Sequence, residues 1–298
     1  MALPRETQAI LFGLGAVALW STVATAFKLG LAFLTPIQML WLGCLFSLGF
    51  FILARFFVSP TSLTKSACLR AGLLGLLNPL AYYLILFEAY NRLPAQIAQP
   101  LNYTWAITLA ILAVPLLKQR LSLKALVGIG VSYVGVVVLV TRGVTTGFDT
   151  FDAAGITLAL LSTLLWSLYW LATIRMNCHP VVLMLIGFAV ATPIIGVVCW
   201  STDGFPPLTL RALSVGAWVG LFEMGVTFLL WQKALSQTQQ VAKIGQLIFL
   251  SPFISLLLID QILGESVHPS AIISNGLIIV VVLSVSYPLL TLPTILLV

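Results

Sequence analysis

Aromatic side chains that can also form hydrogen bonds crowd the middle of an apolar stretch between residues 153 and 174. Trp166, Tyr169 and Trp170 lie within five positions there, and the two Trp residues are four apart, so they share one face of a helix. Membrane helices usually keep Trp and Tyr at the two water interfaces. Rings near the middle of the bilayer therefore need another explanation. Because ring faces stack on planar molecules and attract cations, one explanation is a binding site.

Further rings and amide side chains fall at similar depths in other apolar stretches. An indole N–H or a Tyr hydroxyl facing lipid would lose its hydrogen bonds, at a cost of about 1–3 kcal/mol. Several such groups at one depth indicate a shared interior, either a packed core or a cavity open to water, and we favour the cavity because amides lie nearby. The candidate substrate-binding residues are Trp20, Asn78, Tyr82, Tyr83, Gln99, Asn102, Tyr103, Trp105, Trp166, Trp170 and Gln246. Trp41, Trp200 and Trp231 lie near the ends of their stretches and are expected to be interface anchors.

Glu223 is an acidic residue near the middle of an apolar stretch, about twelve residues from Arg211. A charge at this depth costs about 3 kcal/mol on insertion scales, so the carboxyl group must be protonated, paired or hydrated. We include it among the candidate substrate-binding residues, where it would bind a substrate ammonium or carry a coupling proton. The alternative is a neutral carboxyl group with a structural hydrogen bond. Glu88 lies nearer the end of its stretch, where it can pair with Arg92.

Ten apolar stretches position these residues and predict an all-α membrane protein. The chain has 298 residues, of which 60% are hydrophobic and 7% charged, whereas a soluble domain has about 25% charged residues. Runs of about 20 apolar residues match the thickness of the hydrocarbon core. The predicted spans are 8–28, 36–58, 69–90, 95–117, 123–141, 153–174, 180–200, 211–235, 239–260 and 267–290. The first resembles a signal peptide but is too long for the apolar region of one, so we take it as a span.

Few residues are of the kinds that catalyse reactions or hold metals. The two histidines, His179 and His268, precede prolines in loops, and the sequence has no metalloprotease, nucleophile-elbow or phosphate-loop motif. Its four cysteines have no paired spacing, which argues against a disulfide framework or a metal site. The net charge is +6, but basic residues do not cluster as in nucleic-acid-binding proteins. We therefore expect no enzymatic activity, no cofactor and no nucleic-acid partner.

Basic residues are divided unequally between the two ends of the predicted spans. Ten Lys and Arg residues lie at the end that carries Arg5, and four lie at the opposite end. The end richer in Lys and Arg usually faces the cytoplasm. Because an even number of spans returns the chain to the side where it began, we expect a multi-pass protein of the cell inner membrane with both termini cytoplasmic.

Sequence features recur at an offset close to 146 residues. Trp20-Ser21 recurs as Trp166-Ser167, and Leu117–Ser122 aligns with Leu263–His268. The spans divide equally between residues 1–145 and 146–298. Each unit has five spans, an odd number, so the second unit enters the membrane from the opposite face and the two are inverted repeats. Such repeats are typical of secondary transporters, which hold the substrate between them near the middle of the bilayer.

The chain resembles the drug/metabolite transporter superfamily of the EamA type. The resemblance rests on the two five-span units, the early Trp-Ser in each, Leu263-Gly264-Glu265 before the last span, and the glycines of that span. The first unit departs from this pattern and reads Leu117-Lys118-Gln119. The greatest similarity is to bacterial exporters of aromatic amino acids. The resemblance implies ten helices around a central cavity that opens alternately to each side, lined by Trp20, Tyr82, Tyr83, Tyr103, Trp105 and Trp166.

The sequence thus predicts a secondary transporter that exports amino acids, aromatic and other neutral ones, from the cytoplasm by alternating access. The alternative within the same superfamily is an exporter of drugs or cationic toxicants through the same cavity. An ion channel or a structural membrane subunit is a further alternative, which would lack saturable transport. We expect a monomer, with a dimer through Gly128, Gly130 and Gly135 as the alternative.

Overall fold

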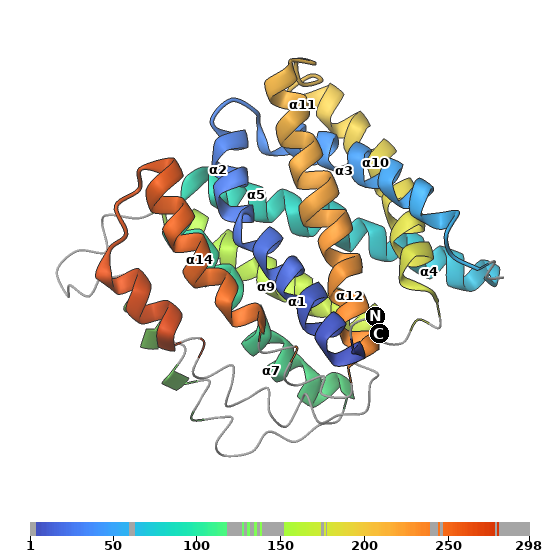
Figure 1. The fold of residues 1–298 in the computed structure, drawn as a ribbon. Coiled ribbons are helices and arrows are strands. Elements are labelled where there is room, and N and C mark those ends of the chain that lie inside the picture. The colour runs from blue at the N-terminus through green and yellow to red at the C-terminus, as the bar shows by residue number, and fades with distance from the viewer. Residues whose placement is uncertain are drawn as a thin grey trace.

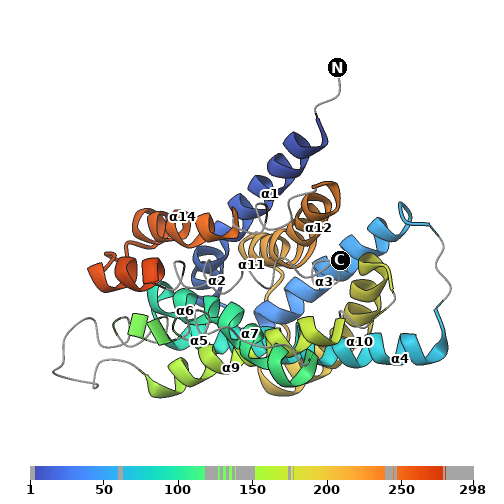
Figure 2. The ribbon, with the colours of Figure 1, turned by 90° about the horizontal axis from the view of Figure 1, so that it is seen from below.

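The computed structural model shows an all-helical arrangement of long helices that cross one another (Figure 1). It describes residues 4–59, 63–117, 152–173, 178–238 and 247–277, with a few single positions between and beyond these ranges. In chain order the helical elements are α1 (Arg5–Ser21), α2 (Val23–Leu31), α3 (Pro36–Arg55), α4 (Lys65–Gly75), η1 (Leu76–Ala81), α5 (Tyr82–Arg92), α6 (Ala95–Tyr103), α7 (Trp105–Leu117), α9 (Ala153–Thr173), α10 (Pro180–Thr202), α11 (Leu210–Ala217), η3 (Trp218–Val226), α12 (Thr227–Gln237), η4 (Leu247–Leu250), α14 (Ser251–Leu258) and η5 (Ile259–Leu263). Seen from below, α1 and α12 lie in one layer and α4, α5 and α9 in another (Figure 2).

Seven helical segments of the described residues are long and apolar enough to cross a membrane. They are Arg5–Leu31, Pro36–Arg55, Lys65–Arg92, Ala95–Leu116, Ala153–Thr173, Pro180–Thr202 and Leu210–Gln237. These segments confirm seven predicted spans, with ends that differ by a few residues. Most of the predicted span 123–141, and parts of 239–260 and 267–290, lie outside the described residues. Within the last two, Ser251–Leu263 forms a shorter apolar helix and residues 269–277 are helical.

Several helices begin at a Thr whose hydroxyl replaces a missing helical acceptor. Thr35 accepts a hydrogen bond from the Gln38 N–H at 3.4 Å, and the Gln38 side chain accepts from the Thr35 N–H at 3.2 Å. This reciprocal capping box precedes Pro36, which suits the first position of a helix because its nitrogen needs no partner there. The Thr64 and Thr209 hydroxyls accept from the Ala67 and Ala212 N–H groups and so cap α4 and α11, without the reciprocal side-chain bond. These caps fix where the spans start.

Four of the long spans are interrupted near their middle, one of them at Thr104 between α6 and α7. Between α4 and α5, Asn78 has φ −145° and ψ 114°, outside the helical region. Pro79 follows it, and a proline disfavours helical conformation in the preceding residue. The first span breaks at Thr22, between α1 and α2, and the eighth contains the π-helical stretch η3. Several of the residues predicted to bind substrate, among them Trp20, Tyr82 and Glu223, lie in or beside these irregular segments, as is common at functional sites.

Two helix crossings bring backbone against backbone. Where α4 crosses α10, a Cβ atom on Gly75 would overlap the backbone of Gly187. Where α3 crosses η3, a Cβ atom on Gly220 would overlap the carbonyl oxygen of Gly43. The Ser47 hydroxyl lies 2.8 Å from the Gly43 carbonyl oxygen and 2.9 Å from that of Gly220, so it joins the two helices. Small residues permit such close approach of membrane helices.

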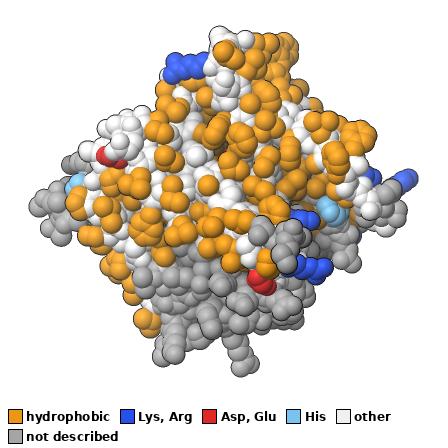
Figure 3. Space-filling model, viewed as in Figure 1, with side chains coloured by type: hydrophobic (Ala, Val, Ile, Leu, Met, Phe, Trp, Pro, Cys, Tyr) orange, Lys and Arg blue, Asp and Glu red, His pale blue; other side chains and the backbone are white. Residues whose placement is uncertain are grey.

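Apolar side chains cover the outside of the molecule as well as its core. Figure 3 shows hydrophobic side chains across the face in view, with the charged side chains mostly near its margins. Trp200, near the end of α10, and Leu257 on α14 are 69% and 67% exposed. A monomeric soluble protein rarely exposes such continuous apolar surface, whereas a lipid-facing surface requires it.

Candidate functional site

Rings from three spans form a cluster that we call the ring cluster, composed of Tyr82, Tyr83, Trp105, Trp166 and Trp170. The centroid of the Tyr82 ring lies 4.6 Å from that of Trp166 and 4.7 Å from that of Tyr83. Trp166 lies 6.5 Å from Trp105 and 5.8 Å from Trp170. Aromatic pairs interact at about these separations. The structure thus brings together five of the predicted site residues, from α5, α7 and α9.

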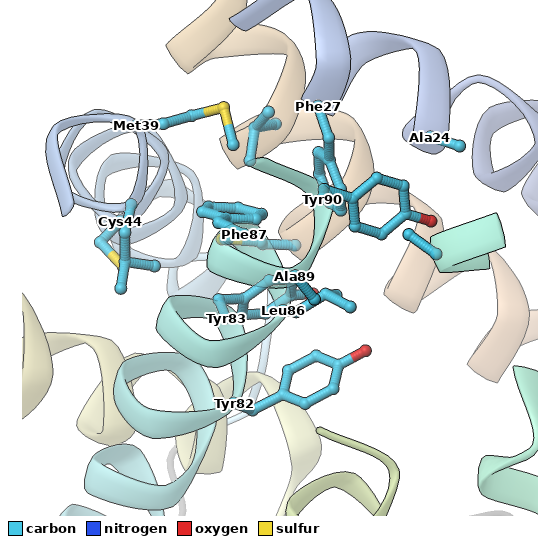
Figure 4. Close-up of a cluster of buried hydrophobic side chains, with 14 of the residues drawn as sticks. Ala24, Phe27, Met39, Cys44, Tyr82, Tyr83, Leu86, Phe87, Ala89 and Tyr90 are labelled. Atoms are coloured by element: carbon cyan, nitrogen blue, oxygen red, sulfur yellow. The ribbon is translucent and has the colours of Figure 1, made fainter. Parts of the chain in front are cut away.

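The two tyrosines of the ring cluster start α5, directly after the break at Asn78. Successive residues of a helix point about 100° apart, so the two rings face different neighbours. Figure 4 shows Tyr83 on the side of α5 that faces Cys44 of α3, with Tyr82 farther from it. Both side chains are 4% exposed. Tyr82 therefore faces Trp166 of α9, and Tyr83 faces a different group of residues.

Glu223 of η3 is the polar residue that Tyr83 contacts. The Tyr83 hydroxyl donates a hydrogen bond to Glu223 Oε1 at 3.1 Å, and Trp20 approaches the same carboxyl group. Glu223 Oε2 is buried and has no hydrogen-bond partner among the described residues. Trp20 packs against Trp231 of α12, with 5.4 Å between ring centroids. The sequence does not show which side of α12 faces α1, so this contact was not predicted.

Polar side chains link the ring cluster to neighbouring helices. The Asn102 amide donates to Ser162 Oγ at 3.0 Å and to the Tyr82 hydroxyl at 3.5 Å. The Tyr103 hydroxyl donates to Ser251 Oγ at 2.8 Å, at the start of α14. The serines were not predicted as site residues. Ser162 precedes Trp166 by four positions and so shares its face of the helix, a signal that sequence reasoning could have used.

Three other predicted site residues have different outcomes. Gln99 is 2% exposed, and its carbonyl oxygen has no hydrogen-bond partner among the described residues. Asn78 lines a pocket between α4, η1, α9 and α10 together with Tyr169 and Met184. Gln246 lies outside the described residues. The structure therefore does not show that these three side chains join the ring cluster.

The site offers rings and one carboxyl group, which suits binding more than catalysis. The indole nitrogen of Trp170 is buried without a described partner, and its ring stacks on Phe228 with 5.6 Å between centroids. The described part of the chain contains no group of three or more His, Cys, Asp or Glu residues able to hold a metal ion. Unpartnered buried polar atoms are costly unless water or a ligand satisfies them. This arrangement favours a ligand with a planar group and hydrogen-bonding atoms.

A second group of charged residues lies at the end of the spans farthest from Arg5, which we call the distal end. Arg92 Nε lies 2.6 Å from Glu88 Oε1, which confirms the predicted pair, and Arg92 Nη1 lies 2.9 Å from Asp152 Oδ2. Its hydrogen bond with Arg92 holds the pKa of the Asp152 carboxyl below the ordinary value. A cavity of about 520 Å³ opens beside Arg92.

Comparison with known proteins gives both the fold and a family. The model of the EamA-like transporter family matches the chain twice, over residues 7–141 and 153–287. A solved structure described only as "Crystal structure of protein" aligns with a TM-score of 0.66 and 22% sequence identity, covering 93% of this chain and 98% of that one. At this identity the likeness concerns the fold alone. No curated protein matches the chain.

Proposed function

The chain belongs to the EamA-like transporter family of small-molecule membrane transporters, and from this we propose that it exports amino acids, aromatic and other neutral ones, from the cytoplasm by alternating access. The observation that carries the choice of substrate is the ring cluster beside a buried carboxyl group. Ring stacking and cation–π contacts contribute about 0.5–2 kcal/mol each. Such contacts tolerate variation of the side chain, which suits a transporter of several amino acids.

The substrate ammonium binds Glu223 in this proposal. Glu223 Oε2 is a buried acceptor without a described partner, and the Tyr83 hydroxyl holds the other oxygen in place. Glu223 lies in the π-helical stretch η3, five residues before Phe228 near the start of α12. Phe228 stacks on Trp170, so the span that carries Glu223 also contacts the ring cluster, and in this proposal the aromatic side chain of the bound substrate packs against these rings.

Alternating access follows if the two matched units are inverted repeats. Exchange of the units maps one set of helix contacts onto another: α1 packs against α12, and the corresponding α9 packs against α5. The crossing of Gly75 with Gly187 corresponds to that of Gly220 with Gly43, at offsets of 145 and 144 residues. These pairings support two equivalent bundles that rock about a shared axis. Ten helices, and termini that face the cytoplasm, belong to the same proposal.

Export of cationic toxicants is the second candidate function. In the described residues no Lys or Arg belongs to the ring cluster or contacts Glu223, so nothing there pairs with a substrate carboxylate. A planar cation would therefore satisfy the same rings and the same carboxyl group. Competition between phenylalanine and a planar dication decides which ligand class the site prefers.

The test is transport by purified protein in liposomes. A panel of labelled amino acids is applied, and uptake is measured with and without a pH gradient. We expect saturable transport of phenylalanine that decreases at least about fivefold in Trp166→Ala and Tyr83→Ala, as expected for the loss of a contact of about 1 kcal/mol or more. Trp200→Ala is the matched control because Trp200 is 69% exposed on α10. Full activity in both cluster variants would exclude the ring cluster as the substrate site.

A further inference from the structure

The distal end contains a cavity that is separate from the ring cluster. Its volume is about 520 Å³, within the range of small-molecule sites. Its polar walls are formed by Lys28 of α2, Arg92 and Gln96 around the turn from α5 to α6, and Glu265, Ser266 and His268 from the second unit. No Phe, Tyr or Trp is among the described residues that line it. A ligand here is recognised by charge and hydrogen bonding rather than by stacking.

Lys28 brings a positive charge into this cavity without a carboxylate partner. Its ammonium donates to the carbonyl oxygens of Tyr90 at 3.0 Å and Leu93 at 3.1 Å. The ion pairs of the described residues both involve Arg92, so no described carboxylate lies within 4.0 Å of Lys28. An ammonium group has three donors, and two are used here. The part-buried Lys28 therefore retains a donor and a full charge that two neutral carbonyl groups do not neutralise.

Arg92 adds a second cation that is already held in place. Its Nε pairs with Glu88 and its Nη1 with Asp152, which leaves the Nη2 donors without a described partner. A guanidinium fixed by two carboxylates loses little further conformational entropy when it contacts a ligand. Lys28 and Arg92 both line the cavity, and each supplies a donor for a carboxylate.

Glu265 provides the negative charge of the cavity. Its two oxygens accept hydrogen bonds from the backbone N–H groups of Ala95 at 3.2 Å and Gln96 at 3.5 Å, at the start of α6. The Gln96 side chain in turn donates to the Ser266 carbonyl and accepts from the His268 N–H. Glu265 and Lys28 interact electrostatically but do not form an ion pair. The Lys28 ammonium and the Glu265 carboxylate are therefore too far apart to pair directly, which leaves space between them for a ligand.

We propose that this distal cavity is a second amino-acid site that binds the zwitterionic head group. The carboxylate of the ligand contacts Lys28 and Arg92, and its ammonium contacts Glu265, which has remaining lone pairs. The assignment rests on the proposed function, because a substrate leaving the ring cluster towards this end would pass the cavity. With no ring to stack on, the cavity accepts alanine as readily as phenylalanine, whereas the ring cluster prefers phenylalanine.

The test is equilibrium binding of radiolabelled L-alanine to the purified full-length protein in detergent. We expect saturable alanine binding that weakens at least tenfold in Lys28→Gln and is retained in Lys28→Arg. Lys65→Gln is the matched control, since Lys65 is exposed at the start of α4, far from the cavity. Trp166→Ala must also retain alanine binding, because the ligand does not use the ring cluster. Propionate and ethylamine, which each carry half of the head group, should compete at least tenfold less well than alanine.

Each outcome decides between the two proposals. Unchanged alanine binding in Lys28→Gln, loss of binding in Trp166→Ala, or no alanine binding to the unmodified protein would overturn the distal site. Competition by propionate equal to that of alanine would reassign it as a simple anion site. If liposomes show no amino-acid transport while alanine binding still depends on Lys28, the proposed function fails and the distal site stands. If the protein transports phenylalanine but alanine binding does not depend on Lys28, the proposed function stands and the distal site fails.

Discussion

Replacement of Glu223 by Gln tests the binding of substrate ammonium most directly. The change keeps the shape of the side chain, and the amide carbonyl can still accept the hydrogen bond that Tyr83 donates at 3.1 Å. It removes the charge from Oε2, the buried oxygen without a described partner. A hydrogen bond to a charged group contributes about 1.5–3 kcal/mol, and 1.4 kcal/mol corresponds to a tenfold change in affinity. We therefore expect the KM for phenylalanine to rise about 10- to 150-fold.

The assay is the initial rate of phenylalanine transport in liposomes over a range of substrate concentrations. Asp203→Asn is the control, because Asp203 is an exposed carboxylate directly after α10 that lines neither the ring cluster nor the distal cavity. A KM within about twofold of the unmodified value would refute the ammonium assignment. The same variant also tests proton coupling. If Glu223 carries the coupling proton, an imposed pH gradient accelerates the unmodified protein and not Glu223→Gln.

Other predictions concern stability and pH. Gly75→Leu should prevent correct folding because its Cβ would overlap α10, whereas Gly49→Leu should be tolerated because nothing lies within 4 Å of a Cβ there; size-exclusion chromatography and thermal unfolding distinguish these outcomes. The ring of His179 caps α10 by accepting from the Val181 N–H, and desolvation followed by the nearby Arg55 lowers its pKa. The neutral ring of His179 is thus favoured in the folded state. The stabilisation of the folded protein by this cap is therefore complete above the pKa that His179 has in the unfolded chain. It is lost as the pH falls through the lower pKa of the folded state. His179→Ala should reduce the pH dependence of the unfolding temperature in that window. Arg92 lowers the pKa of Asp152, so the ion pair between them should persist to a lower pH than the ordinary pKa of Asp would allow; a pH titration of fluorophore labelling near the distal end checks this.

The spans and the identities of several site residues were accessible from the sequence, because both follow from hydropathy along one chain. Seven spans have the predicted positions within a few residues. The depth argument brought Tyr82, Trp105 and Trp166 to one level, and their rings do meet. Hydropathy gives the depth of a residue in the membrane. In a helix that is apolar on all sides, it does not show which way the side chain points. The three rings that the sequence places at similar positions along their spans therefore do lie together.

The sequence does not show how each helix is rotated about its own axis, and therefore which neighbour each side chain contacts. The ring of Trp231 lies against Trp20 because α12 packs along α1, a contact that hydropathy does not show. Asn78 has a suitable depth, yet the break before Pro79 directs it towards Tyr169 and Met184. The partner of Asn102, Ser162, depends on how α6 crosses α9. Such contacts depend on pairs of helices, and no single segment encodes them.

The two glycine crossings have a consequence for how this protein could be followed as it works. Where backbones touch without intervening side chains, helices can roll over each other without any rotamer having to change. In the alternating access proposed above, points near such a contact move least, and points far along the helices move most. Spin labels beside Gly75 and Gly187 should therefore report one separation in every state of the cycle, while labels at the far ends of α4 and α10 should report at least two.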